Sequence, residues 1–404
     1  MRIRSITYFL NPRWPIGELA FQKAGIFAQH ARQAYVAAGY PVHTVRLATP
    51  PFPEFIHPDD YMTAAARLEI LAHSEGFEYI ALGPALTHLP ESYLAIPELI
   101  ANSGSLFFSG HLTTPNNQIS LPAVQACAEV IHRTAPLEPD GFANLRFAAL
   151  AKVLPWAPFF PAAYHQGNAS AFALALEAAD LVVSAFSAAD SLQSAREALI
   201  EQVEIHAKAL QAVSLKLANS YQIEFKGLDF TPAPFPEPDK SIGKALEHLG
   251  VPGFGQSGSL AAAAFLTDTL DRANFQRTGF NGLMLPLLED STLAKRAAQG
   301  VLNVTELLIF SAVCGTGLDT IPLSGDTSVE QIRAVLLDLA ALSLRLDKPL
   351  TARLMPIPGK KAGDETGFDF EYFANSSVLA LPSEPLSGLL VGNESFDIRS
   401  RHKS

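Results

Sequence analysis

Several side chains that could do chemistry follow short apolar runs in the second half of the chain. Cys314 precedes two glycines, whose backbones can bend tightly after it, and Asp319 lies in the apolar run that comes next. Asp326 then occupies the turn that opens a predicted helix. A thiolate can act as a nucleophile and a carboxylate as an acid–base group. The arrangement therefore indicates a site, but it names no reaction. An ordinary small buried cysteine is the favoured alternative for Cys314.

Other reactive side chains follow apolar runs in the same way. Glu289 and Asp290 come after one run, and a glycine-bounded basic loop with Lys360 and Lys361 comes after another. In parallel α/β folds, the loops after the carboxyl ends of strands gather on one face and build the site. This repeated placement favours an enzyme with Glu289, Asp319 and Asp326 as acid–base groups. Asp290 and Asp326 would equally suit helix N-caps, which is the alternative.

Arg353 stands inside a predicted strand, where a charge must be paired or must face a pocket. If it faces inward it is the best anion ligand in the chain, with Lys360 and Lys361 assisting from the next loop. The alternative is a buried ion pair with a neighbour such as Asp319. Replacing Arg353 with methionine distinguishes these roles. An anion ligand predicts that anion binding is lost while the fold stays intact, and a buried ion-pair partner predicts that the protein unfolds.

Four further residues are weaker candidates for substrate binding. Asp229 precedes a proline-rich loop, and Gly255 and Gly258 belong to a GxGxxG run. That run follows a helix instead of a strand, so a tight turn explains it better than a dinucleotide loop does. His165 lies in a polar loop near aromatic residues, where it could exchange protons or could simply be structural.

The cofactor is not specified by the sequence, although a divalent cation is a possible one. Carboxylates supply the oxygen ligands that such an ion prefers, and Asp290 and Asp364 are the candidate ligands. No tight metal-binding spacing supports the idea, because neither DxDxDG nor HExxH occurs. Hydrogen bonds to loop amides are the alternative use of these carboxylates.

The elements that must position these residues alternate between strand and helix along almost the whole chain. Such alternation predicts an α/β architecture with a mostly parallel sheet. No long flexible linker interrupts it, so residues 1–404 are expected to form one compact domain, with possible halves 1–220 and 221–404. Predicted strands cover residues 3–10, 41–47, 79–82, 106–109, 145–153, 181–185, 222–229, 283–288, 318–323 and 350–357. Predicted helices cover residues 20–38, 58–73, 91–103, 123–134, 187–219, 241–249, 257–271 and 328–346.

Composition limits the classes of partner. Only 17% of the 404 residues are charged while 48% are hydrophobic, which predicts a large core or a homo-oligomer interface. The net charge of −11 argues against nucleic acid, and the basic run at residues 399–403 is expected to be a solvated tail. Two cysteines exclude a disulfide scaffold. No signal peptide or membrane span is recognised, so a cytoplasmic protein without a membrane partner is expected.

Seven segments of the chain together resemble an uncharacterised prokaryotic family, known only as domain of unknown function seven-eleven. The resemblance implies a fold similar to the α/β barrel of pyruvate formate-lyase, and it implies no activity. The segments are residues 311–327 (SAVCGTGLDTIPLSGDT), 229–234 (DFTPAP), 253–258 (GFGQSG), 282–290 (GLMLPLLED), 356–364 (PIPGKKAGD), 144–147 (NLRF) and 158–165 (PFFPAAYH).

The same resemblance raises the question of radical chemistry at Cys314. Enzymes of the pyruvate formate-lyase type generate a thiyl radical from a glycyl radical in an Arg-Val-x-Gly-Tyr-like motif. Here Gly392 follows a valine, but the arginine and the tyrosine are missing. The chain is therefore expected to be a non-radical enzyme acting on a small anionic metabolite. The alternative is a non-catalytic ligand-binding or regulatory protein on a degenerate barrel.

Overall fold

A nine-stranded mixed sheet organises the computed structural model, which describes residues 1–382 and 384–400. Its strand order is β8-β7-β1-β2-β3-β4-β6-β10-β9. The middle block from β1 to β6 is parallel, and the pairs β7–β8 and β10–β9 run antiparallel to it on either side. The expected α/β class with a mostly parallel sheet is confirmed. The strands are β1 (Arg2–Phe9), β2 (Val42–Ala48), β3 (Tyr79–Ala85), β4 (Leu106–His111), β6 (Phe147–Ala151), β7 (Ala171–Glu177), β8 (Glu224–Asp229), β9 (Gly317–Ser324) and β10 (Leu350–Ile357), and a separate pair joins β5 (Gln118–Ser120) to β11 (Ser395–Asp397).

The sheet is not closed into the barrel that was expected, because β8 and β9 remain its two edges. An irregular segment lies between these edges and touches each through one isolated bridge, Arg277 to Leu228 of β8 and Pro286 to Asp319 of β9. Pro286 has no backbone N–H and cannot continue a ladder. The strand predicted at residues 283–288 was therefore wrong, and part of that run is a short 3₁₀ helix instead.

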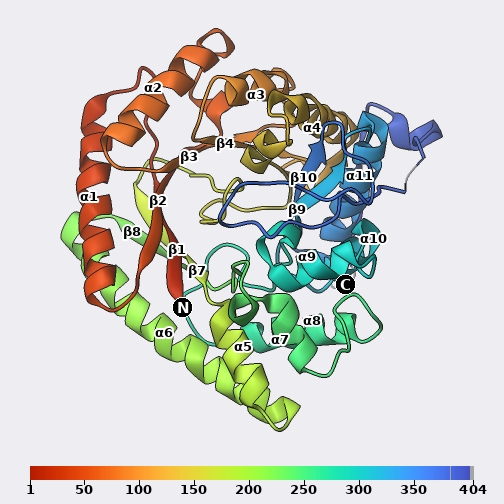
Figure 1. Ribbon diagram of the computed structural model, residues 1–404. Helices are drawn as coiled ribbons and strands as arrows, with labels where there is room; N and C mark the ends of the chain where they lie inside the picture. The colour runs from red at the N-terminus through yellow and green to blue at the C-terminus, as the bar shows by residue number, and fades with distance from the viewer. Residues whose placement is uncertain (383, 401–404) are drawn as a thin grey trace.

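Helices surround the outer face of the sheet, while irregular segments fill the middle of the molecule (Figure 1). The main hydrophobic core lies between these helices and the strands. The α-helices are α1 (Glu18–Ala37), α2 (Tyr61–Ser74), α3 (Glu91–Ala101), α4 (Leu121–Thr134), α5 (Ala179–Ala188), α6 (Leu192–Tyr221), α7 (Ile242–His248), α8 (Ser259–Arg272), α9 (Ser291–Ala298), α10 (Val304–Phe310) and α11 (Val329–Leu346). The 3₁₀ helices are η1 (Phe52–Glu54), η2 (Pro58–Asp60), η3 (Ala135–Leu137), η4 (Phe142–Arg146), η5 (Pro238–Lys240), η6 (Leu287–Glu289) and η7 (Gly388–Val391).

Part of the inner face of the sheet is covered by residues 152–170, which we call the inner loop. A second core cluster joins this loop to the strands, and alanines such as Ala48, Ala81 and Ala173 supply much of it. Small side chains leave room for the inner loop to pass close to the sheet. The hydroxyls of Ser5 and Thr7 on β1 both lie 3.4 Å from the carbonyl oxygen of Pro158 in this loop.

Two predicted boundaries failed between residues 170 and 192. Residues 181–185 were expected to be a strand but belong to α5, whose buried residues Ala179, Val182, Ala185 and Phe186 recur with helical spacing. The long helix expected from residue 187 begins at Leu192 as α6, after a capping box at Ser191. Short apolar runs fit both periods, so their type depends on flanking residues.

No helix in the described ranges is both long and apolar enough to span a membrane. Of the basic run at residues 399–403, only the first two residues are described, and residues 401–403 lie outside the described part. The side chain of Arg399 is 94% exposed, as expected for a solvated tail.

Candidate functional site

A cavity of about 370 Å³ lies on the inner face of the sheet. Residues of β1, β2, β3, β4, β7 and β10 form one part of its wall. The inner loop, η4, η6 and residues 370–372 form most of the rest, together with Ser103, Gly104 and Glu138. Arg4, Arg46, Arg353, Glu289 and His43 supply most of its ionisable groups. The cavity therefore joins residues that are far apart in the sequence.

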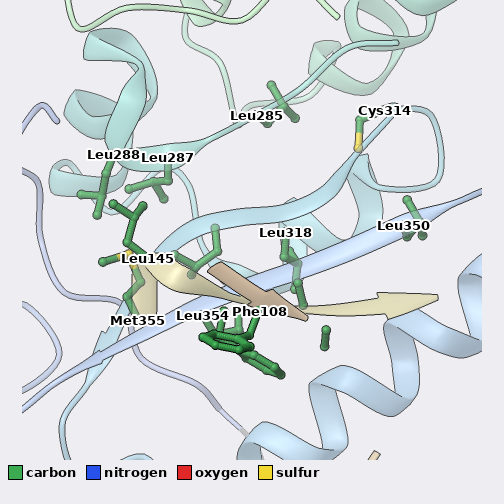
Figure 2. Packing of buried hydrophobic residues seen from close by; sticks show 14 of the residues in the cluster. Phe108, Leu145, Leu285, Leu287, Leu288, Cys314, Leu318, Leu350, Leu354 and Met355 are labelled. Carbon is green, nitrogen blue, oxygen red and sulfur yellow. The ribbon is translucent and has the colours of Figure 1, made fainter. Parts of the chain in front are cut away.

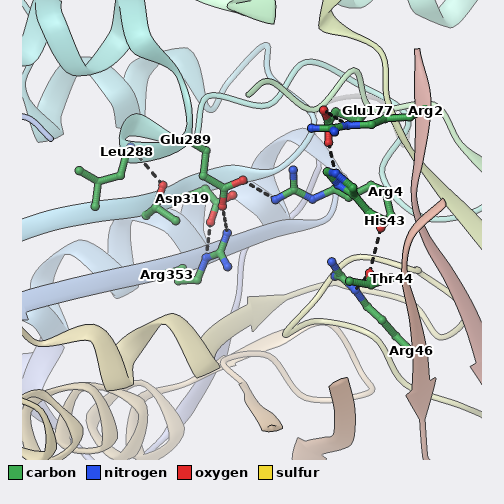
Figure 3. Close-up of polar contacts among 11 residues, drawn as sticks. Arg2, Arg4, His43, Thr44, Arg46, Glu177, Leu288, Glu289, Asp319 and Arg353 are labelled. Atoms are coloured by element: carbon green, nitrogen blue, oxygen red, sulfur yellow. Dashed lines mark hydrogen bonds and ion pairs between the residues drawn. The ribbon is translucent and has the colours of Figure 1, made fainter. Parts of the chain in front are cut away.

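Arg353 and Glu289, two of the predicted site residues, meet in this cavity through a buried ion network (Figure 3). The Nε of Arg353 donates to Asp319 at 2.6 Å, and its Nη2 donates to Glu289 at 2.9 Å. The other oxygen of Glu289 accepts from Arg4. Arg353 is 5% exposed, Glu289 3% and Asp319 0%. The ion pair between Arg353 and Asp319, proposed as the alternative to a free anion ligand, is present.

The pKa values of the two carboxylates in this network, Glu289 and Asp319, are shifted in opposite directions. Burial alone would raise the pKa of Glu289, but the charges of Arg4 and Arg353 outweigh it and hold that pKa below its usual range. Burial raises the pKa of Asp319, and the nearby negative charge of Glu289 adds to this, despite the ion pair with Arg353. Glu289 is therefore a weak base, and Asp319 contacts Arg353 without lining the cavity.

Arg46 on β2 is the cavity cation that the network does not neutralise. Its Nε donates to the hydroxyl of Thr44 at 2.8 Å, and that hydroxyl donates to the carbonyl oxygen of Arg4. Among the described residues, no carboxylate forms an ion pair with Arg46. Loss of water around the guanidinium, together with repulsion from Arg4, lowers its pKa to about 10. Arg46 therefore stays charged at neutral pH and can receive an anion.

His43 is the cavity group best suited to proton transfer. Its Nδ1 lies 3.2 Å from Oε2 of Glu177, whose other oxygen accepts from Arg2 at 2.6 Å. Burial alone would raise the pKa of Glu177, but His43, Arg4 and Arg2 hold it below the usual range. A carboxylate this close to Nδ1 favours a proton on that nitrogen and leaves Nε2 for exchange with a ligand.

Arg4, Arg46, His43 and Glu177 were all missed as site residues in the sequence. A charged side chain inside a strand singled out Arg353, and the same signal was present at positions 4 and 46. A charged side chain inside a strand indicates a site because parallel strands are usually apolar on both faces.

Several predicted site residues lie outside this cavity. Asp326 is exposed and accepts from the hydroxyl of Ser324, and the carbonyl oxygen of Lys360 accepts from the backbone N–H of Gly325. Lys361 and Asp364 are exposed on the next turn, where the backbone N–H of Lys361 donates to Asp364 at 2.7 Å. None of these residues lines the cavity. The basic loop and Arg353 thus do not form one anion site.

Asp290 is the buried N-cap of α9 and also holds the start of α7. Its oxygens accept from the hydroxyl of Ser241 at 2.6 Å and from four backbone N–H groups, those of residues 242, 243, 292 and 293. Hydrogen bonds therefore already use the oxygens that were proposed as metal ligands. Within the described ranges, no group of three or more His, Cys, Asp or Glu side chains could hold a metal ion.

Asp229 also has a structural setting, at the end of β8. It accepts from the backbone N–H groups of Thr231, Phe280 and Asn281 and from the Thr231 hydroxyl. Burial raises its pKa, and these hydrogen bonds oppose the rise. The carboxylate thereby ties the proline-rich loop to the segment between the sheet edges, away from the cavity.

The glycine run and His165 are likewise structural in this fold. Gly255 and Gly258 have φ values of +107° and +102° in the turn before α8, conformations that favour glycine. The N–H of Gly255 donates to the hydroxyl of Ser259. His165 is buried, its Nε2 lies 2.9 Å from the carbonyl oxygen of Ala169, and burial lowers its pKa. None of the three residues lines the cavity.

Cys314 is buried just before β9, where it packs near Leu285 and Leu318 (Figure 2). The backbone N–H of Gly317 donates to its sulfur at 3.3 Å. It does not line the cavity that contains Arg353. Cys314 therefore does not share a cavity with Arg353, whereas a shared cavity would have favoured an enzyme with a thiolate nucleophile.

Neither cysteine should react rapidly with iodoacetamide in the native protein, because both thiols are buried. Burial also raises the pKa of the Cys127 thiol, which reduces its thiolate fraction. Mass spectrometry of labelled peptides should show slow modification until denaturant is added, and Cys314→Ser should fold normally. Fast labelling of Cys314 at mildly acidic pH would show a thiolate nucleophile instead.

Comparison with known proteins gives a family but no activity. A family model described as Uncharacterised ACR (DUF711) matches residues 1–375, a range that includes every residue lining the cavity. A UPF0210 protein of Pyrobaculum aerophilum is 29% identical over 345 residues, which cover 81% of this chain and 76% of that protein. A UPF0210 protein of Neisseria meningitidis serogroup B is 26% identical over 353 residues, which cover 83% and 78%.

Proposed function

This chain belongs to the uncharacterised DUF711 family, and from its cavity we propose that it is an enzyme that binds a small anionic metabolite and transfers a proton on it. One observation carries the proposal. Arg46, a cation without a carboxylate partner among the described residues, lines the same cavity as His43 with its carboxylate Glu177. A fixed cation beside a positioned histidine suits general acid–base catalysis on a bound anion.

The proposed chemistry needs no nucleophile from the protein. The carboxylate of the ligand binds Arg46, and Nε2 of His43 removes a proton from the adjacent carbon. The C–H electron pair stays on the ligand as an enediolate, and its added negative charge lies against Arg46. Return of the proton from His43 to the same carbon regenerates the carboxylate and the neutral imidazole. Glu177 stabilises the imidazolium that forms between the two steps.

Glu289, Asp319 and Arg353 take a supporting role in this proposal. The low pKa of Glu289 makes it a poor base, and its two arginine contacts fix its position. Asp319 holds the Nε side of Arg353. The network thereby sets the shape and charge of the cavity wall instead of exchanging protons with the ligand.

A non-catalytic ligand-binding protein is the second candidate. The scatter of the predicted catalytic groups favours it, because Cys314 and Asp326 lie outside the cavity that contains Arg353 and Glu289. Both candidates use the anion site at Arg46, and they differ only in what happens after binding.

The finer prediction for the fold also remains a proposal. The segment between the edge strands contacts β8 and β9 through the bridges at Arg277 and Pro286, which gives the open sheet a barrel-like course. This supports a relationship to the barrel of pyruvate formate-lyase without its radical motif. The homo-oligomer and the cytoplasmic location also stay predictions.

A thermal-shift screen with small monocarboxylates and inorganic phosphate tests the binding step. A ligand at about 100 times its Kd should stabilise the native state by about 2.7 kcal/mol. Bound carboxylates are then incubated in heavy water, and proton NMR should show deuterium entering at the carbon beside the carboxylate. His43→Asn should keep the binding and lose the exchange.

The outcomes separate the two candidates. Binding with neither exchange nor any other conversion would support the non-catalytic protein. Binding that survives in Arg46→Met would show that the anion occupies another place. Exchange that persists in His43→Asn would remove His43 from the mechanism.

A further inference from the structure

One wall of the cavity is a group of aromatic rings contributed by β3, β4 and the inner loop. The rings of Tyr79 and Phe107 lie 5.3 Å apart between centroids, and those of Phe107 and Phe160 lie 5.5 Å apart. Both pairs meet edge to face, at interplanar angles of 76° and 65°. We call this group the sheet-side rings.

A second group of rings lines the same cavity from η4 and from residues 370–372. The centroids of Phe142 and Phe370 lie 5.0 Å apart, and those of Phe370 and Tyr372 also lie 5.0 Å apart. We call this group the loop-side rings. No ring contact within the described ranges joins the two groups, although all six residues line one cavity. The open volume therefore separates two aromatic surfaces.

Arg46 lies against the sheet-side rings, whereas His43 lies against Tyr372 of the loop-side rings. The guanidinium carbon of Arg46 lies 5.6 Å from the Tyr79 ring centroid and 5.1 Å from that of Phe160. The ring of His43 meets that of Tyr372 at 5.6 Å and an interplanar angle of 88°. A ligand bound at Arg46 and within reach of His43 must therefore lie between the two groups.

The ion pairs of the cavity leave one guanidinium group without a carboxylate. Four of the five guanidinium groups in or beside the cavity form ion pairs. Arg46 is the fifth and has no ion-pair partner among the described residues, so a ligand with a single carboxylate would complete the pairing. The pairs are Arg2 with Glu177, Arg4 with Glu289, Arg146 with Glu138, and Arg353 with Asp319 and Glu289.

We infer that the ligand is a small aromatic monocarboxylic acid, an inference that rests on the anion site proposed above. Its carboxylate binds the two terminal nitrogens of Arg46. Its ring lies between the sheet-side and the loop-side rings, where edge-to-face and offset contacts with aromatic side chains are favourable. An aliphatic acid makes the same charge contact but leaves the aromatic surfaces unfilled.

Isothermal titration calorimetry with three probes tests this inference: 3-phenylpropionate, butanoate and inorganic phosphate. The phenyl compound should bind at least about tenfold more tightly than butanoate, because its ring buries additional apolar surface. Phosphate should bind no more tightly than butanoate. Phe370→Ala should weaken binding of 3-phenylpropionate about tenfold and leave butanoate unchanged. Phe275→Ala is the matched control, since Phe275 is also a partly buried loop residue but does not line the cavity.

Each of the other outcomes would contradict one specific part of this inference. Equal affinity for the two carboxylates, or an unchanged Kd in Phe370→Ala, would overturn the aromatic ligand while the anion site stands. Tighter binding of phosphate would overturn the monocarboxylate. Failure of all three probes to bind would overturn both this inference and the proposed function. Circular dichroism of both phenylalanine variants confirms that any change in affinity is not unfolding.

Discussion

Replacing Arg353 with methionine should lower the free energy of unfolding by about 3–5 kcal/mol at neutral pH. The guanidinium donates to Asp319 and Glu289, and all three side chains are buried. Its removal leaves Asp319 without its ion pair, while Glu289 keeps only Arg4 among its arginine contacts. An unpaired buried charge is expensive because neither water nor a counter-ion compensates it.

This loss of stability should shrink as the pH falls. Asp319 has a folded-state pKa above its ordinary value, so its ionised form opposes folding at neutral pH and protonation relieves that cost. Glu289 has a lowered pKa, so its contribution to stability is present at neutral pH and is lost on acidification. Without Arg353, Asp319 becomes more costly when ionised and Glu289 stabilises less. Both changes fade as the carboxylates become protonated.

Urea unfolding near pH 7.5 and near pH 4, followed by fluorescence, measures both effects, because the contribution of Glu289 is lost only below its ordinary pKa. Arg67→Met is the control, because the pair of Arg67 with Glu18 is exposed and should contribute less than about 1 kcal/mol. An Arg353→Met protein as stable as the wild type would show that the network does not hold this part of the fold.

Replacing Arg46 with methionine should weaken carboxylate binding on the order of 100-fold without lowering the melting temperature. Arg46 has no carboxylate partner among the described residues, and burial lowers its pKa to about 10, so its charged form is disfavoured in the folded protein. Methionine keeps much of the apolar stem and removes this disfavoured charge. Functional groups often reduce stability in this way.

Paired calorimetry and thermal melts on Arg46→Met check both halves of this prediction. Arg67→Met again serves as the control and should bind normally. Arg46→Lys should give an intermediate Kd, because lysine keeps the charge but loses the two-pronged geometry. A lower melting temperature with unchanged binding would mean that Arg46 is a structural residue.

Most of the architecture was predictable because the apolar periods of the strands and helices are strong. Eight of the nine strands in the large sheet coincide with predicted runs, for example β9 with the run 318–323 and β10 with the run 350–357. Pro322 inside β9 is tolerated because β9 is an edge strand. The sequence could not reveal that the edges stay open, since closure depends on the pairing of distant segments.

β7 was missed although it lies inside the sheet, between β8 and β1. Its residues Ala171–Glu177 alternate alanine with large apolar side chains, so no polar residue marks one face. The fold explains the alternation. Ala171 and Ala173 pack against the inner loop, whereas Phe172 and Leu174 belong to the outer core. In β7 the alternation of small and large side chains therefore distinguishes the two faces of the strand, as an alternation of polar and apolar residues does elsewhere.

The site was predictable only in part. Arg353, Glu289 and Asp319 were named from the sequence and do meet, but Asp326, Lys360 and Lys361 lie elsewhere. The prediction relied on residues that follow the carboxyl ends of strands in the later part of the chain. There β9 and β10 run opposite to the middle block, so their carboxyl ends do not lie with those of the middle strands. The cavity also takes Arg4, Arg46 and Tyr79 from strands near the amino terminus. Only the three-dimensional pairing brings these two regions together.

The central claim is that the cavity binds the carboxylate of a small molecule at Arg46. Crystals grown with 3-(4-bromophenyl)propionate test it most directly, because anomalous scattering locates the bromine independently of the protein model. We predict a bromine peak between the sheet-side and the loop-side rings, with the carboxylate within hydrogen-bond distance of Arg46. A peak outside the cavity, or an empty cavity in crystals saturated with the compound, would contradict it.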